Sequence, residues 1–261
     1  MGSSQAGSEG PTAHYACLAR GGQVKGKCGE FRTRTLMIFQ LPVSSIVILL
    51  PLLLFSLVIH EYAHARTAWS FGDGTAKAMG RMTLNPLVHI DPIGALALLF
   101  AGFGWARPVP VNPFNLRPRR LGDIAVSLAG PASNLMIAIL SLLLLRGWVA
   151  LDSHVSIADN LFDTVAKVLS FLAIINIGLF AFNLVPLFPL DGHHILRELL
   201  PGFHQDGFMR WQMQYGRIFL MALLFGPTLL TRVTNNPDIP DPLGMLFSYA
   251  TRLILTVTGT I

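Results

Sequence analysis

Charged residues are scarce in this sequence, and cysteine is scarcer still. Only 13% of the 261 residues are charged and 52% are hydrophobic, whereas an average soluble domain has about 25% charged residues. Two cysteines, Cys17 and Cys28, are too few for a disulfide framework. These shortages exclude an ordinary soluble domain and a small disulfide-bonded fold.

Acidic residues are also fewer than basic ones, which gives a net charge of +5. No basic stretch is interleaved with aromatic residues that could stack on bases, so we expect no nucleic-acid partner. In a membrane protein, an excess of Lys and Arg is typical of cytoplasmic loops.

Long apolar runs are abundant instead. They cover residues 36–59, 93–105, 124–145, 165–185, 214–230 and 243–260. A helix crosses the hydrocarbon core with roughly 20 apolar residues, so we predict an all-α, polytopic transmembrane helical bundle of about six spans in a lipid bilayer. The 93–105 run is short for a span, and the last run could span or lie at the interface.

The other segments suggest one membrane domain, 36–261, preceded by a tail. Residues 1–35 are polar, basic and rich in Gly and Ser, which predicts disorder. The 106–122 loop is basic, and the 147–164 loop has three Asp and no Lys or Arg. The positive-inside rule then predicts that the tail and the 106–122 loop are cytoplasmic and the 147–164 loop is outside.

The first apolar run leads directly into "HEYAH", residues 60–64. Residues four apart lie on one face of a helix, so His60 and His64 can bind one ion, and Glu61 can act on a water beside it. This is the HExxH arrangement of zinc hydrolases. A bare HExxH also occurs by chance, but an uncompensated charge at membrane depth is costly, and a divalent ion would offset that cost.

A catalytic zinc site generally has three protein ligands, and "FNLVPLFPLDGHHIL" (182–196) offers Asp191 as the third. Pro186 and Pro189 break the helix before it, and broken backbone at membrane depth is tolerated where it lines a cavity. The alternative is that Asp191 only caps a helix. His193 and His194 have no role that the sequence assigns.

These motifs together resemble the site-2 protease family of intramembrane zinc metalloproteases, peptidase family M50. The resemblance rests on His60-Glu61-xx-His64 and on Asn183-xx-Pro186-xx-Pro189-Leu190-Asp191-Gly192, with "GRMTLNPLVHIDPIG" (80–94) and "AGPASN" (129–134) in support. It implies Zn²⁺ held by His60, His64 and Asp191, with Glu61 as general base. It also implies transmembrane protein substrates that are cut within or near the bilayer, and we expect a bacterial inner-membrane enzyme.

The resemblance also directs attention to three further candidate catalytic residues. His89 lies in a position close to the family's catalytic centre, where it could stabilise an oxyanion or bond a ligand, or it could be a loop histidine bonded to backbone. Asn134 and Asn183 could lie near the site, although a membrane-buried amide often bonds a neighbouring helix instead.

"WARPVPVN" (105–112) alternates valine and proline. It could form a short extended or re-entrant segment near the active site that holds an unwound substrate, or it could be a plain connector.

The competing function is a membrane metal transporter or metal-binding protein that uses the same histidines. A transporter is expected to place polar residues along a path through several spans. Here they cluster at one site, and HExxH carries a glutamate that transport does not require.

Overall fold

The computed structural model describes residues 43–101, 104–152, 155, 158–236 and 238–259. This part of the chain is helical and contains no strand. Its elements are α2 (Val43–Ser70), α3 (Thr75–Ala78), α4 (Pro86–His89), α5 (Pro92–Ala101), α6 (Arg119–Asp152), α7 (Asp159–Asn183), α8 (Asp191–Leu199), α9 (Gly202–Trp211), the π-helical turn η2 (Gln212–Gly216), α10 (Arg217–Thr234) and α11 (Pro242–Val257). The predicted all-α bundle is confirmed. The predicted tail, 1–35, lies outside the described residues.

Four helices among the described residues are long and apolar enough to cross a membrane: Ser45–Ser70, Arg119–Asp152, Asp159–Asn183 and Gly202–Thr234. The last combines α9, η2 and α10. In the described part of the 93–105 run the helix is α5, which begins at Pro92 and has 10 residues, too few for a span, and α11 has 16 residues. The predicted count of six spans is therefore not confirmed.

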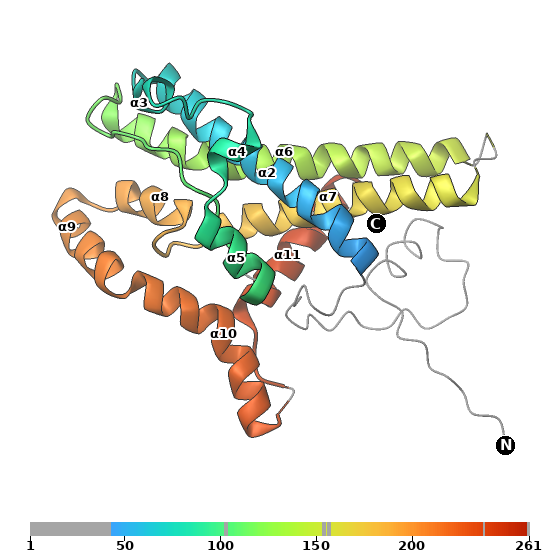
Figure 1. Cartoon of the computed structure of the whole chain (residues 1–261). Helices are drawn as coiled ribbons and strands as arrows, with labels where there is room; N and C mark the ends of the chain where they lie inside the picture. Colours follow the sequence, from blue (N-terminus) through green and yellow to red (C-terminus); the bar gives the residue numbers. More distant parts are fainter. Residues whose placement is uncertain (1–42, 102–103, 153–154, 156–157, 237, 260–261) are drawn as a thin grey trace.

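The centre of the bundle is the pairing of α6 with α7. Figure 1 shows these two long helices side by side, with α2 packed across them. Small and branched residues of α6, α7 and α11 form the main core, which includes Ala138, Ala173, Ile177 and Ala250. Small residues let helix backbones approach closely, as in membrane bundles generally.

The short helices between α2 and α6 begin and end at recognisable signals. Gly72 has φ of +99°, a conformation that glycine adopts freely, and it ends α2. Asn85 caps α4, because its side chain accepts a hydrogen bond from the N–H of Leu87 at 3.1 Å, and Pro86 follows at the first helical position. The chain thus turns sharply at the end of α2 and runs back along it.

The 106–122 loop is anchored at the C-terminal end of α2. The N–H of Arg117 donates to the carbonyl of Phe71 at 2.8 Å, and the N–H of Asn112 donates to Asp73 Oδ2 at 2.7 Å. Which side of the membrane this loop occupies stays a prediction, as it does for the tail and the 147–164 loop.

Candidate metal centre

His60, His64 and Asp191 lie together although Asp191 is far from the histidines in sequence. The Nε2 atoms of His60 and His64 are 3.0 Å apart. Asp191 Oδ2 is 3.2 Å from Nε2 of His60, and its Oδ1 is 3.3 Å from Nε2 of His64. The two histidines come from α2, and Asp191 is the first residue of α8.

Hydrogen bonds at the far side of each imidazole fix how the two rings are oriented. Nδ1 of His64 is 2.7 Å from the carbonyl oxygen of Val126, and Nδ1 of His60 is 2.6 Å from Oδ1 of Asn134. Both partners are acceptors, so each Nδ1 carries the hydrogen and donates it. In the neutral form of each ring, Nε2 is then left with a lone pair.

Three groups that can only accept hydrogen bonds therefore converge on one point. Oδ2 of Asp191 is buried and has no hydrogen-bond partner among the described residues. Such an arrangement is repulsive unless a metal cation or a proton lies between the lone pairs. A tetrahedral zinc site with bonds of about 2.0–2.1 Å has ligand atoms about 3.3 Å apart, which agrees with the distances observed. The three residues fit a zinc ion.

Gly130 of α6 forms the floor of this cluster. A Cβ atom at position 130 would lie 2.3 Å from Nε2 of His64 and 2.5 Å from Cε1 of His60. No side chain can be accommodated there, because these contacts are far below van der Waals distance. The glycine of "AGPASN" thus leaves room beside the metal-binding atoms.

Glu61 is buried and points toward the segment that precedes α6. Its Oε2 accepts a hydrogen bond from the backbone N–H of Val109 at 2.8 Å. The same segment is held by Arg81, whose Nη2 donates to the carbonyl of Arg107 at 2.6 Å. The 105–112 segment therefore covers the candidate general base. Among the described residues, its β-type pairing is an isolated antiparallel bridge between Ile90 and Ala106, so its role in substrate binding stays a prediction.

The other predicted site residues lie at different places. Asn134 contacts His60, as described above. His89 is buried, its Nε2 is 2.9 Å from the carbonyl oxygen of Thr83, and its Nδ1 has no hydrogen-bond partner in the described part of the chain. Asn183 donates to the carbonyl of Leu179 in its own helix at 2.9 Å. Among the described residues, no hydrogen bond joins His89 or Asn183 to the three candidate ligands.

Several groups around the centre were not predicted from the sequence. Asn176 of α7 donates and accepts hydrogen bonds behind Asn134, and an amide inside an apolar span was the available signal. The carbonyl of Val126 and the N–H of Val109 are backbone groups, which every sequence position offers, so no residue type could have indicated them.

A buried ion-pair cluster fixes α8, which begins with Asp191, against α6. Arg197 of α8 pairs with Asp123 of α6 and with its neighbour Glu198. Nε of Arg120 donates to the carbonyl of Glu198 at 2.8 Å. These contacts hold the third candidate ligand close to the two histidines.

Titratable groups near α8 and α3 are perturbed by their surroundings. Burial, with a smaller contribution from His193, lowers the pKa of His194 to about 4. Burial alone would raise the pKa of Asp73, but hydrogen bonds from Thr75, Asn115 and Asn112 outweigh it and hold the pKa below its ordinary value. Asp73 is thus an anionic anchor for the 105–116 segment.

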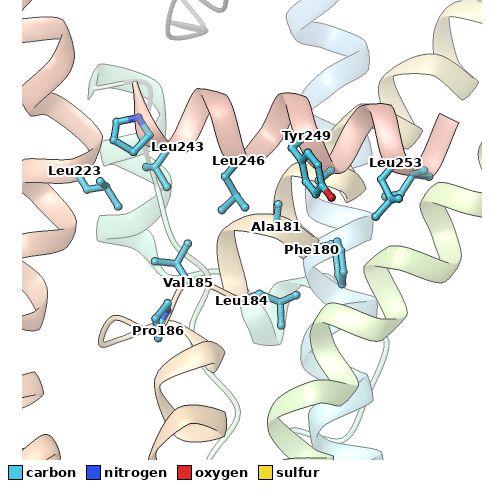
Figure 2. Close-up of a pocket in the computed structure, with 13 residues that line it drawn as sticks. Phe180, Ala181, Leu184, Val185, Pro186, Leu223, Leu243, Leu246, Tyr249 and Leu253 are labelled. Carbon is cyan, nitrogen blue, oxygen red and sulfur yellow. The ribbon is translucent and has the colours of Figure 1, made fainter. Parts of the chain in front are cut away.

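A separate apolar pocket of about 460 Å³ lies between α7, α10 and α11. Figure 2 shows Leu184, Val185 and Pro186 on one side of it and Leu246 and Tyr249 on the other. None of the three candidate ligands lines it. It adjoins the break after α7 through which the chain reaches Asp191.

Comparison with known proteins finds a matching family model and similar curated proteins. The model of peptidase family M50 matches residues 145–227, a part that contains Asp191 but not His60 or His64. The "Putative zinc metalloprotease YwhC" of Bacillus subtilis is 45% identical over 192 residues, which cover 71% of this chain and 84% of that protein. The "Putative zinc metalloprotease Rip2" of Mycolicibacterium smegmatis is 32% identical over 181 residues, which cover 67% of this chain and 66% of that protein. No solved structure matches the chain.

Four helices that are long and apolar enough to cross a membrane, a His-His-Asp cluster that fits zinc and the family match together indicate a membrane zinc metallopeptidase. The chain belongs to peptidase family M50. This membership favours the peptidase over the metal transporter that the sequence left open.

Proposed function

We propose that this chain is a zinc endopeptidase that hydrolyses peptide bonds of transmembrane segments within or near the bilayer. The observation that carries the proposal is the place of the HExxH motif inside a helix that is long and apolar enough to cross a membrane. His60 lies in the candidate span Ser45–Ser70, ten residues before its end. At about 1.5 Å per residue, His60 is roughly 15 Å from the end of the helix, which is about half the thickness of a hydrocarbon core of about 30 Å.

The proposed ligands are His60, His64 and Asp191, and Glu61 is the proposed general base. A bound zinc ion would supply an activated water, since it lowers the pKa of its water to about 7. Glu61 would accept a proton from the attacking water and pass it to the leaving amine. The hydrogen bond from the N–H of Val109 would orient the carboxylate for both transfers.

His89 is proposed to act near the reacting carbonyl. Its hydrogen bond to the backbone determines which ring nitrogen carries a hydrogen, and therefore what the side chain can donate. Its Nε2 faces a carbonyl oxygen and therefore carries a hydrogen. In the neutral ring, Nδ1 then has a lone pair and can only accept. Only the imidazolium form could donate to an oxyanion from Nδ1, whereas the neutral form could bond a donor on the substrate.

Asn134 and Asn183 are proposed in different roles. Asn134 would act through His60, because its Oδ1 contacts Nδ1 of that histidine. Asn183 lies at the end of α7, where its Nδ2 is bonded within the helix. Its Oδ1 would be the atom that meets an N–H of the substrate backbone.

We further propose that the enzyme resides in a bacterial inner membrane and takes part in regulated intramembrane proteolysis of transmembrane protein substrates. Relatives from Bacillus and Mycolicibacterium support a bacterial setting. The buried position of the cluster supports substrates that reach it from the bilayer, because a soluble chain would have to enter an apolar environment.

Comparative proteomics of membrane fragments tests this proposal. Cells that carry the wild type are compared with cells that carry Glu61→Gln, and the new termini of fragments are mapped. We expect fragments that depend on Glu61 and end inside or next to transmembrane segments. If all such termini fall in soluble domains far from the bilayer, the proposed substrate class is wrong.

A further inference from the structure

A line of buried polar side chains leads from His60 away from the candidate ligands. Nδ2 of Asn134 donates to Oδ1 of Asn176 at 2.8 Å. Nδ2 of Asn176 donates to Oγ of Ser56 at 2.8 Å. Asn134, Asn176 and Ser56 each have 0% of their surface exposed, and they come from α6, α7 and α2.

At the end of this line that is far from His60, Asn176 and Ser56 also donate hydrogen bonds to backbone carbonyls. Nδ2 of Asn176 also donates to the carbonyl of Leu172 at 2.8 Å. The hydroxyl of Ser56 donates to the carbonyl of Leu52 at 2.8 Å. Carbonyl oxygens only accept, so the Ser56 hydroxyl must receive the bond from Asn176, and Asn176 must present its oxygen to Asn134.

This polarity determines which end of Asn134 meets His60. If the Asn134 amide were turned over, its oxygen would face the oxygen of Asn176, and its NH₂ group would face Nδ1 of His60. Two buried acceptors would then oppose each other, which is costly. In the observed orientation, Oδ1 of Asn134 requires a hydrogen on Nδ1 of His60.

We propose that Asn176 and Ser56 are positioning residues for the metal: acting through Asn134, they hold His60 in the Nδ1–H tautomer that presents the Nε2 lone pair to zinc. The inference rests on the proposed role of His60 as a ligand. The alternative is that the same bonds only hold α2, α6 and α7 together, as polar groups do in many membrane bundles. Zinc affinity separates the two, because helix cohesion alone would not alter it selectively.

The chain offers a matched pair of serines for the test. Ser56 and Ser141 are both buried, and each donates to the carbonyl four residues earlier in its own helix, at 2.8 and 2.7 Å. Only Ser56 also accepts the bond from Asn176. Ser56→Ala and Ser141→Ala therefore make the same chemical change and differ in the link to His60.

The measurement is the zinc dissociation constant of the detergent-solubilised full chain, obtained by chelator competition, with thermal unfolding of the zinc-free protein recorded in parallel. We expect both variants to unfold at similar temperatures. Ser56→Ala should bind zinc about tenfold more weakly, the lower end of the effect of losing a group behind a ligand, and Ser141→Ala should bind as wild type does. Equal zinc affinities for the two variants would overturn the proposal.

A double-mutant cycle tests the route of the effect. Asn176→Leu should weaken zinc binding in the wild-type background and change nothing further in an Asn134→Leu background, because its action passes through Asn134. Additive losses would contradict the proposal. Since no proteolysis is measured, failure here is distinct from failure of the proposed function. Should His60→Ala leave zinc affinity unchanged, the ligand assignment itself is at fault.

Discussion

The backbone N–H of Val109 donates a hydrogen bond to Oε2 of Glu61 at 2.8 Å, joining a proline-flanked loop to the middle of the HExxH motif. A loop segment thereby holds the candidate general base of a spanning helix. Pro108 and Pro110 on either side restrict the backbone. The N–H of Val109 is therefore held in place at a small cost in conformational entropy.

The first prediction follows from that bond. Val109→Pro removes the N–H, whereas Val109→Ala keeps it and serves as the control. A hydrogen bond to a charged group contributes about 1.5–3 kcal/mol, so turnover should fall roughly tenfold to hundredfold in the proline variant with zinc content unchanged. Cleavage rates and bound zinc are measured on the same samples. If both variants lose activity equally, the N–H is not the cause.

The second prediction concerns the floor of the metal centre. Gly130→Ala would place a methyl group 2.3 Å from Nε2 of His64, so zinc should be lost and activity with it. Gly147, in the same helix α6, has nothing within 4 Å of its would-be Cβ, and Gly147→Ala should keep zinc and stabilise the helix by up to about 1 kcal/mol. Elemental analysis of both proteins decides. Full zinc occupancy in Gly130→Ala would contradict the geometry.

The third prediction concerns the anchor of the 105–116 segment. Asp73 accepts hydrogen bonds from Thr75, Asn112 and Asn115, which keep its pKa low against the effect of burial. A lowered folded-state pKa means that the ionised carboxylate stabilises the fold above the unfolded value, about 3.9. This contribution is lost as the pH falls through the folded-state pKa.

Asp73→Asn should therefore lower the unfolding temperature near pH 7, because an NH₂ group would face several donors, and the difference from wild type should shrink as the pH falls below about 4. Thermal unfolding across pH 3–8 measures it. If the difference in unfolding temperature between wild type and Asp73→Asn grows as the pH falls, the ionised Asp73 does not stabilise the fold.

The fourth prediction concerns the contact between α8 and α6. Arg197→Met leaves the buried Asp123 without its cation, and removing one partner of a buried ion pair costs roughly 3–5 kcal/mol. Because α8 begins with Asp191, zinc affinity should fall together with stability. Arg210→Met, at an exposed position on α9, is the control and should change neither. An Arg197→Met protein as stable as wild type would argue against this role.

The sequence predicted the parts of the centre that depend on local spacing. His60, Glu61 and His64 follow from helical periodicity alone. The broken helix before Asp191 offered it as a third ligand but left a helix cap as the alternative, because its approach to α2 depends on how α8 packs against α6. Asn176 and Gly130 act through neighbours from other helices, and no local pattern gives those neighbours.

The number of spans is the part of the predicted fold that is not confirmed. The 93–105 run is apolar enough for a membrane, but the helix described there, Pro92–Ala101, has 10 residues, so hydropathy alone does not give the number of spans. The predicted side of the membrane for the 106–122 loop depends on that number. The alternation of valine and proline in 105–112 indicated an extended segment, but not that its N–H at Val109 would bond Glu61.

The most direct test of the central claim measures peptide cleavage and bound zinc together. A transmembrane peptide in liposomes is the substrate, and wild type, Glu61→Gln and Asp191→Asn are compared. Glu61→Gln should keep its zinc and lose turnover by roughly 10² or more, the usual scale for a general base, whereas Asp191→Asn should lose zinc and activity together. If Glu61→Gln holds zinc and cleaves as fast as wild type, Glu61 is not the base.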